Sequence, residues 1–278
     1  MESDLKIQTR PSQIEAVAAE VFATLGSGQQ ITPFSARSAG LTLEEANRVS
    51  ALLKQKFVAR GEKIVGRKIG FTNRTIWPQY GVYAPNWGYM TDRTVSDLGP
   101  ASTVAAHDFV EPRIEPEIVF GFARAPNVGM DDAALLGCVE WTAHGFEIVQ
   151  SIFPDWKFTP ADTAAANAMH GALLIGKRHA VAPRKSGWLR ELPSFDIDLC
   201  CNGAVIDRGS ASNVLDGPVS ALRHLVQLLA DDPLNPPLAA GEIVTTGTLT
   251  RAMPVKPGET WTTRLRGIPL EGIGLRLR

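Results

Sequence analysis

The sequence predicts an α+β fold in which a mixed β roll or barrel carries an N-terminal helical region. Two amphipathic helical segments lie within the first 62 residues, and from residue 63 the chain consists mostly of short β-prone runs separated by glycine and proline. Many short strands with few helices favour a mixed roll or barrel over a parallel sheet that alternates with helices. We therefore divide the chain into a helical region, residues 1–62, packed on a β-roll body, residues 63–278.

The first expected helix covers residues 12–26, where apolar side chains recur at helical spacing and Gly26 provides a stop. The second follows Thr42, which stands three residues before Glu45 in the pattern of a capping box. Its apolar positions continue to Phe57. Each helix therefore has one apolar face to bury against the body.

The body is expected to contain six strands, because six runs of β-prone residues are bounded by turn-forming residues. Two further helices are expected, one from residue 131 to about 151 and one at 219–230 that follows Gly217 and Pro218. The expected strands are 63–71, 113–122, 171–175, 195–201, 242–246 and 260–265.

The composition is ordinary for a soluble globular protein, for which a small molecule is the default partner. Of 278 residues, 44% are apolar and 21% are charged, and the net charge is −1 without a lysine or arginine run. Nucleic acid and membranes are therefore not expected partners. No segment reaches the ~20 apolar residues of a membrane span, and the acidic N-terminus does not resemble a secretory signal. We expect a cytoplasmic location.

An acidic pair stands inside a β-prone run. Glu115 and Glu117 flank Pro116, and on a strand side chains two residues apart point to the same face. Two carboxylates held side by side repel each other unless a cation or a shared proton neutralises them. Pro116 lacks an N–H group, which suits an edge or bulged strand better than a central one.

A third acid, Glu147, stands alone in the apolar run 145–149. Burial of a carboxylate without a partner is costly, so this residue requires a neutralising group. One interpretation joins Glu115, Glu117 and Glu147 in an all-oxygen site for Mg²⁺ or Mn²⁺. The alternative is a solvent-facing glutamate pair on an edge strand, with Glu147 paired to an arginine.

A lysine lies in the earlier run 66–72. Strand alternation puts Lys68 on the opposite face from Arg67 and Ile69, so one of the two basic groups is expected to point inward. An acidic cluster nearby favours the charged form of such a lysine. The alternative is a lysine on the outer surface of a strand.

Five segments in order resemble the 2-keto-4-pentenoate hydratase and 4-oxalocrotonate decarboxylase group of the fumarylacetoacetate hydrolase superfamily. The resemblance extends from about residue 12 to the C-terminus. The segments are 66–72 with 81–82 and 85–88; 112–120; 147–156 with 162–176; 209–218; and 241–248 with 254–258.

The resemblance implies a mixed β-sandwich roll of the fumarylacetoacetate hydrolase type with an N-terminal helical region, and a homo-oligomer built on dimers. It places the metal ligands at Glu115, Glu117 and Glu147 and an active-site lysine at Lys68. The expected metal is Mg²⁺ or Mn²⁺, and the expected partner is a small 2-oxo or 2-hydroxy-dienoic acid.

The implied activity is that of a hydratase that adds water to a 2-hydroxy-2,4-dienoate-type acid, giving a 4-hydroxy-2-oxo acid during the degradation of aromatic compounds. The nearest alternative is decarboxylation of a 2-oxo-dicarboxylate such as 4-oxalocrotonate. Hydrolysis of a C–C bond in acylpyruvates ranks lower, because residues 71–76 contain neither histidine nor glutamate. A subunit that only supports a partner enzyme is the non-enzymatic alternative.

Further polar side chains fall in the matching segments. His170 is expected to be a catalytic residue, because a histidine beside a pocket segment can reach the substrate and titrates near neutral pH, with a structural role as the alternative. His144 is interpreted as a structural histidine, with a ligand or base as the alternative. Three residues depart from the group's pattern: Asn86 replaces an acidic residue, Ile152 an arginine and His170 a small residue. These departures imply either an unusual substrate or weak or lost hydratase activity. The residues expected to position substrate, or alternatively to cap turns, are Asn86, Trp87, Asp162, Asn167, Ser210 and Thr248.

Overall fold

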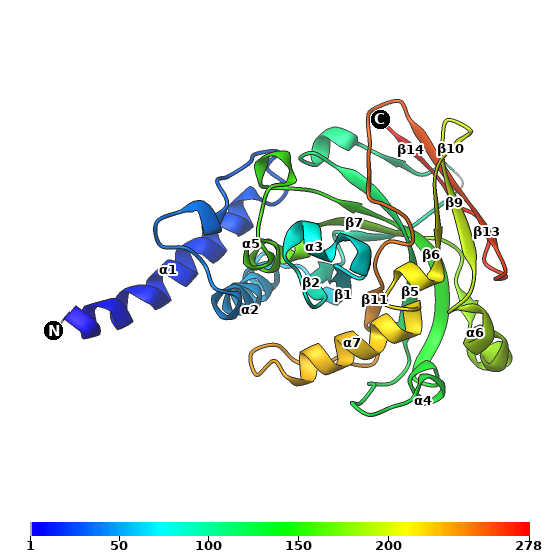
Figure 1. The fold of residues 1–278 in the computed structure, drawn as a ribbon, viewed down its shortest axis with the longest axis horizontal. Coiled ribbons are helices and arrows are strands. Elements are labelled where there is room, and N and C mark those ends of the chain that lie inside the picture. Colours follow the sequence, from blue (N-terminus) through cyan, green and yellow to red (C-terminus); the bar gives the residue numbers. More distant parts are fainter. Residues whose placement is uncertain (1, 100) are drawn as a thin grey trace.

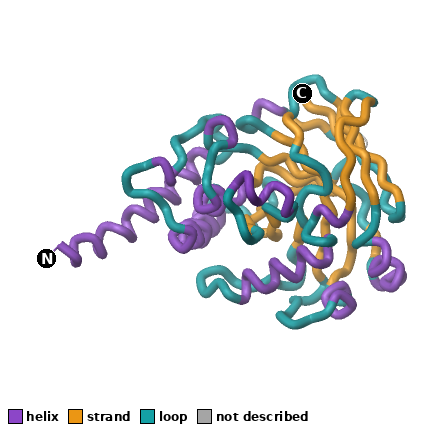
Figure 2. Tube along the Cα trace, viewed as in Figure 1, coloured by secondary structure: helices purple, strands orange, loops and turns teal. Residues whose placement is uncertain are grey.

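Two β-sheets form the body of the protein, and helices flank them. The computed structural model describes residues 2–99 and 101–278. The strands gather at one end of the molecule and the N-terminal helices at the other, with α1 reaching away from the sheets (Figure 1, Figure 2). The expected α+β class is confirmed.

The helices and strands have the following bounds. The helices are α1 (Glu2–Thr24), α2 (Leu43–Ala59), α3 (Trp77–Tyr80), α4 (Asp132–Leu136), α5 (Pro160–Ala165), α6 (Lys185–Glu191) and α7 (Pro218–Ala230). The strands are β1 (Ile64–Gly70), β2 (Asn86–Thr91), β3 (Val95–Asp97), β4 (Thr103–Val104), β5 (Arg113–Phe122), β6 (Val139–Val149), β7 (His170–Ile175), β8 (His179–Ala180), β9 (Asp196–Cys201), β10 (Ala204–Ser210), β11 (Ile243–Thr245), β12 (Met253–Pro254), β13 (Thr260–Arg266) and β14 (Gly274–Leu277).

The larger sheet has the order β2-β1-β11-β5-β6-β7-β3, with β12 paired to β5 and β8 to β6. Its longest pairing joins β5 and β6 in antiparallel register. The smaller sheet has the order β10-β9-β13-β14-β4. Ile114 and Phe146 of the larger sheet share a buried cluster with Leu199 and Trp261 of the smaller one, so the two sheets pack face to face. This arrangement is a mixed sandwich.

Strand alternation places the two faces of β5 in different environments. The face that carries Ile114, Ile118 and Phe120 is fully buried in the apolar core. The opposite face carries Glu115 and Glu117. The larger sheet therefore uses one face for packing and leaves the other for an acidic site.

All six expected strands are present within a few residues of their predicted bounds. The helix expected from residue 131 to about 151 is wrong. Only α4 forms there, begun by the Asp131 side chain, which accepts a hydrogen bond from the Ala134 N–H, and ended at Gly137. The rest is β6, buried on both faces from Thr142 to Val149. A central strand buried on both sides is apolar throughout, which hides its alternation.

The expectation that Pro116 marks an edge or bulged strand is also wrong, because β5 lies between β11 and β6. The carbonyl of Pro116 points away from β6 and accepts a hydrogen bond from the N–H of Leu249. The missing N–H group would point to that same side. Pro116 therefore removes no bond from the pairing of β5 with β6.

The N-terminal helices pack against the body. The expected capping box at Thr42 and Glu45 is present at the start of α2. Leu53 of α2 shares one buried cluster with Val21 of α1 and with Phe153 of the body. In the described part of the chain, no helix is both long and apolar enough to cross a membrane.

We predict that Leu53→Ala lowers the free energy of unfolding by about 2–5 kcal/mol, because the substitution leaves a cavity between α2 and the body. Leu43→Ala in the same helix is the matched control, since Leu43 is 53% exposed and Leu53 is 0% exposed. Urea denaturation measures both variants. A Leu53→Ala variant as stable as the control would show that the helices contribute little to the packing.

Candidate metal centre

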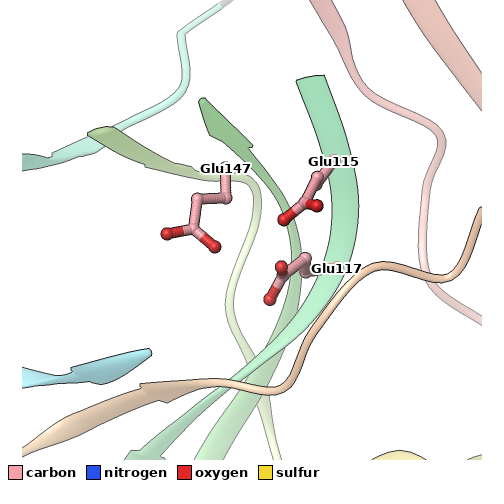
Figure 3. A group of neighbouring side chains, drawn as sticks. All are labelled: Glu115, Glu117 and Glu147. Atoms are coloured by element: carbon pink, nitrogen blue, oxygen red, sulfur yellow. The ribbon is translucent and has the colours of Figure 1, made fainter. Parts of the chain in front are cut away.

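The pairing of β5 with β6 brings three carboxyl groups together. Glu115 lies directly opposite Glu147, and Glu117 lies opposite Gly145 on the same face. One oxygen from each of the three glutamates lies within 4.8 Å of the others. Figure 3 shows the three carboxyl groups pointing toward one another.

Burial makes this cluster electrostatically costly. Burial and the neighbouring Glu147 raise the pKa of Glu115 to about 7, although Lys68 opposes the shift. Burial, together with Glu147 and Glu115, holds the pKa of Glu117 well above its usual range. For Glu147 burial acts in the same direction, but Lys68 and His170 outweigh it and lower the pKa. The cluster therefore lacks enough positive charge to keep all three carboxyl groups ionised.

The hydrogen bonds of Glu117 leave one oxygen free for a cation. Its Oε2 accepts hydrogen bonds from the Thr245 hydroxyl and from the Gly247 N–H, the latter at 2.7 Å. Its Oε1 is buried and has no hydrogen-bond partner among the described residues. A buried acceptor without a donor beside two further carboxylates matches the oxygen ligands that a hard divalent cation takes. The residues present therefore fit a divalent metal.

Lys68 lies on the same face of the sheet as the glutamates. The strand register aligns Lys68 with Thr245 and Thr245 with Val119, two residues after Glu117. The ammonium Nζ lies 3.3 Å from Glu147 Oε2. Burial alone would lower the pKa of Lys68, but the three carboxylates outweigh it and raise the pKa. Arg67 points to the other face and is also buried, paired with Glu242.

The two histidines near the cluster, His144 of β6 and His170 of β7, lie on opposite faces of the larger sheet. His170 Nδ1 lies 2.7 Å from Glu147 Oε1. His144 lies on the core face, where its ring bonds the Glu117 carbonyl and the Thr263 hydroxyl at 2.9 and 3.0 Å. Burial lowers the pKa of His144 to about 4. His144 is therefore a neutral structural histidine.

A cavity of about 100 Å³ opens on the cluster. Lys68 and Glu115 lie at its polar end, and Tyr80 and Phe158 stack with ring centroids 5.4 Å apart in its wall. Its other polar side chains include Asn86, Thr163 and Thr248. The cavity therefore joins a charged end to an aromatic wall, an arrangement suited to an acid with an unsaturated or apolar tail.

Of the residues expected to position substrate, Asn86 and Thr248 line the cavity, whereas Trp87, Asp162, Asn167 and Ser210 are not among its lining residues. Asn86 Nδ2 donates to the Thr163 hydroxyl at 3.1 Å. Trp87 contacts Arg67 on the other face of β1, and Ser210, the last residue of β10, bonds Ser212 in the turn that follows.

Asp162 and Asn167 are committed to structural hydrogen bonds. Asp162 completes the capping box that Thr159 begins at the start of α5, and it accepts hydrogen bonds from the N–H and the hydroxyl of Ser35 at 3.0 and 2.6 Å. The amide of Asn167 bonds both the N–H and the carbonyl of Tyr89. This clamp holds the turn Asn167–Met169, in which all three residues have positive φ. Asn167 therefore shapes the cavity wall through Ala168 and Met169.

Sequence reasoning missed Arg113, which lines the cavity with its guanidinium 4.1 Å from the centre of the Trp156 ring. Its position two residues before Glu115 was a usable signal, because alternation puts both on one face. It also missed Thr245, which bonds Glu117. No pattern in the sequence distinguishes that threonine from its neighbours.

The fold is a mixed β-sandwich, and its larger sheet holds three clustered glutamates and a buried lysine. Together these features define a class of proteins with a divalent-metal site. Residues 79–274 match the fumarylacetoacetate (FAA) hydrolase C-terminal family, and the chain belongs to this family.

Proteins similar to the chain cover nearly its whole length. A 2-hydroxyhexa-2,4-dienoate hydratase of Comamonas testosteroni is 29% identical over 92% of this chain and 94% of its own. A 4-oxalocrotonate decarboxylase of a Pseudomonas species is 31% identical over 82% of this chain and 84% of its own. The structure of 4-oxalocrotonate decarboxylase from Pseudomonas putida G7, complexed with magnesium and adipate, superposes with a TM-score of 0.87 at 25% identity, covering 96% of this chain and 98% of that one.

We predict that Mg²⁺ or Mn²⁺ raises the melting temperature of the wild-type protein and that Glu117→Gln removes most of this rise. A cation at about 100 times its dissociation constant stabilises the folded state by about 2.7 kcal/mol. Without cation, Glu117→Gln is expected to melt no lower than wild type, because a neutral amide removes the repulsion from Glu115 and Glu147.

Glu140→Gln is the control for this measurement, since Glu140 is exposed on the same strand as Glu147. It should keep the full rise in melting temperature. An equal rise in Glu117→Gln and Glu140→Gln would place the cation elsewhere.

Proposed function

We propose that the protein is a divalent-metal-dependent hydro-lyase that adds water to a 2-hydroxy-2,4-dienoate-type acid and forms a 4-hydroxy-2-oxo acid in the catabolism of aromatic compounds. The observation that carries this proposal is the cluster of Glu115, Glu117 and Glu147 beside Lys68 at one end of an aromatic-walled cavity. The similarity to named dienoate hydratases supports the same reaction.

In this proposal Glu115, Glu117 and Glu147 hold Mg²⁺ or Mn²⁺. The bound cation would act as a Lewis acid toward the carboxylate and keto oxygens of a 2-oxo acid. The protein contributes a rigid ligand set, because the carboxyl group of Glu117 is fixed by Thr245 and Gly247 and that of Glu147 by His170. Ligands held in place in advance reduce the cost of organising the site when substrate binds.

Lys68 would supply a positive charge at the point where the substrate becomes more negative. Its ammonium group is buried, so the surrounding protein screens its charge less than water would. Nζ also carries the protons that a general acid needs. We propose that Lys68 stabilises the negative charge at the 2-oxo end of the substrate when the 2-hydroxyl loses its proton, and that it passes a proton to a carbon of the conjugated chain.

The wall of the cavity would hold the rest of the substrate. Tyr80, Phe158 and Trp156 present aromatic surface, and Asn86 and Thr248 add polar groups. A planar conjugated tail fits against such rings by stacking.

Arg113 supports the alternative activity, decarboxylation of a 2-oxo-dicarboxylate. Its guanidinium lies in the cavity against Trp156, where it can pair with a second carboxylate on the substrate. The 31% identity to a 4-oxalocrotonate decarboxylase is consistent with that reading. The substrate of a hydratase that acts on a monocarboxylate has no second carboxylate to pair with the Arg113 guanidinium.

The direct test incubates the protein and Mg²⁺ with 2-hydroxypenta-2,4-dienoate and, separately, with a 2-oxo-dicarboxylate such as 4-oxalocrotonate. The 4-hydroxy-2-oxo acid is the expected product of the first substrate, detected by chromatography, and CO₂ release from the second measures decarboxylation. Arg113→Leu should lower turnover of the dicarboxylate at least about tenfold more than that of the monocarboxylate if the guanidinium pairs with the second carboxylate. Absence of both products would contradict the proposed enzyme.

We predict that Lys68→Met lowers kcat about 10²–10⁴-fold, because a positioned proton donor contributes on that scale. Binding of Mg²⁺ or Mn²⁺ should not weaken, since the substitution removes a positive charge 3.3 Å from Glu147. Steady-state kinetics and calorimetric titration separate the two effects. A Met variant with wild-type kcat would rule out the proposed role of Lys68.

We further propose that the protein works in the cytoplasm as a homo-oligomer built on dimers. This proposal rests on the resemblance of the sequence to the 2-keto-4-pentenoate hydratase group, which implies such an assembly. Analytical ultracentrifugation tests the oligomeric state, and a monomer at micromolar concentration would contradict it.

A further inference from the structure

His170 reaches Glu147 because the ladder between β6 and β7 is irregular. Glu147 pairs with Leu173 and Ile148 with Ala172, but Val149 then pairs with His170 rather than with Gly171. This shift of one residue turns His170 onto the face that carries Glu147. In a regular ladder His170 would lie on the opposite face. The bulge therefore places an imidazole directly behind a proposed metal ligand.

A short chain of hydrogen bonds sets the orientation of the imidazole. The Thr94 hydroxyl lies 2.9 Å from His170 Nε2 and 3.2 Å from the Thr91 carbonyl, and it accepts a hydrogen bond from the Thr91 N–H. The Thr94 hydroxyl has one proton to donate. When it donates that proton to its nearer partner, His170 Nε2 accepts the hydrogen bond. A carboxylate oxygen can only accept, so Nδ1–H donates to Glu147 Oε1 at 2.7 Å. Both ring nitrogens are thereby used.

The hydrogen bond from His170 makes the two carboxylate oxygens of Glu147 different. Oε1 is occupied by His170, whereas Oε2 is buried, makes no hydrogen bond with a described residue and lies 3.3 Å from the Lys68 ammonium. In Figure 3 one carboxylate oxygen of Glu147 is turned toward Glu117 and the other away from it. Glu117 shows the same division, because Thr245 and Gly247 occupy its Oε2 and leave its Oε1 free. Two of the three carboxylates therefore offer one oxygen each.

We infer that His170 is a positioning residue that restricts Glu147 to one-oxygen ligation and thereby makes the site select Mg²⁺ or Mn²⁺ over Ca²⁺. Ca²⁺ takes six to eight oxygens and readily binds a carboxylate through both of its oxygens, whereas Mg²⁺ requires an octahedral set of single oxygens and waters. A carboxylate with one oxygen already bonded suits the second requirement. The inference rests on the proposed metal site and assigns His170 a role away from the substrate.

The experiment is calorimetric titration of the whole protein with Mg²⁺ and, separately, with Ca²⁺. His170→Leu removes the donor with an apolar side chain, and the Thr94 hydroxyl can then bond the Thr91 carbonyl. Loss of a hydrogen bond behind a metal ligand costs about 10–100-fold in affinity, and Ca²⁺ should regain part of that loss by using Oε1. We expect the ratio of Ca²⁺ to Mg²⁺ affinity to rise about tenfold or more.

His170→Asn keeps a donor at the position of Nδ1 and should keep a ratio within about threefold of wild type. His107→Leu is the control for removing a histidine, since the His107 side chain is 76% exposed, and it should change nothing. A ratio in His170→Leu within about twofold of wild type would overturn the inference, given the affinity scale expected for such a donor. Wild-type protein that binds neither cation would instead overturn the proposed metal site.

Thr94→Val provides a second test that leaves His170 in place, and it decides the matter if His170→Leu does not fold. It removes the hydroxyl that fixes the ring, so the same ratio should rise about threefold. An unchanged ratio in folded Thr94→Val, with His170→Leu unchanged or unfolded, would overturn the inference.

Discussion

The mutual repulsion of three carboxylates held on one sheet face is the constraint on which the rest of the site depends. β5 and β6 lie in the middle of the larger sheet, so Glu115, Glu117 and Glu147 cannot separate without breaking the longest strand pairing. Burial strengthens the repulsion because few water molecules remain to screen it. The surrounding residues and a divalent cation together relieve that repulsion.

Each group around the cluster reduces the repulsion between the carboxylates in a specific way. Lys68 contributes one positive charge. Thr245 and Gly247 donate hydrogen bonds to one oxygen of Glu117, and His170 donates to one oxygen of Glu147. What remains is an excess of negative charge on the free oxygens. The same excess that destabilises the cation-free cluster gives the site its affinity for a metal ion.

The cavity adds selectivity to the charge of the cluster. Its wall includes residues held in strained conformations, since Phe71, Trp156, Ala168 and Met169 have positive φ. Such conformations persist where the surrounding contacts fix them, as the clamp between Asn167 and Tyr89 does for the turn at 167–169. The shape of the substrate pocket thus depends on contacts several residues away from it.

The sequence by itself determined the features that depend on near neighbours along the chain. Alternation on a strand put Glu115 and Glu117 on one face, and the Thr42 capping box marked the start of α2. Only the tertiary structure decided the face of Glu147, since its run of apolar residues suggested a helix and proved to be a central strand. It also decided that Asn167 clamps a strand and that a bulge turns His170 toward Glu147. The physical reason is that strand register and bulges are set by pairing between distant segments, which local periodicity does not encode.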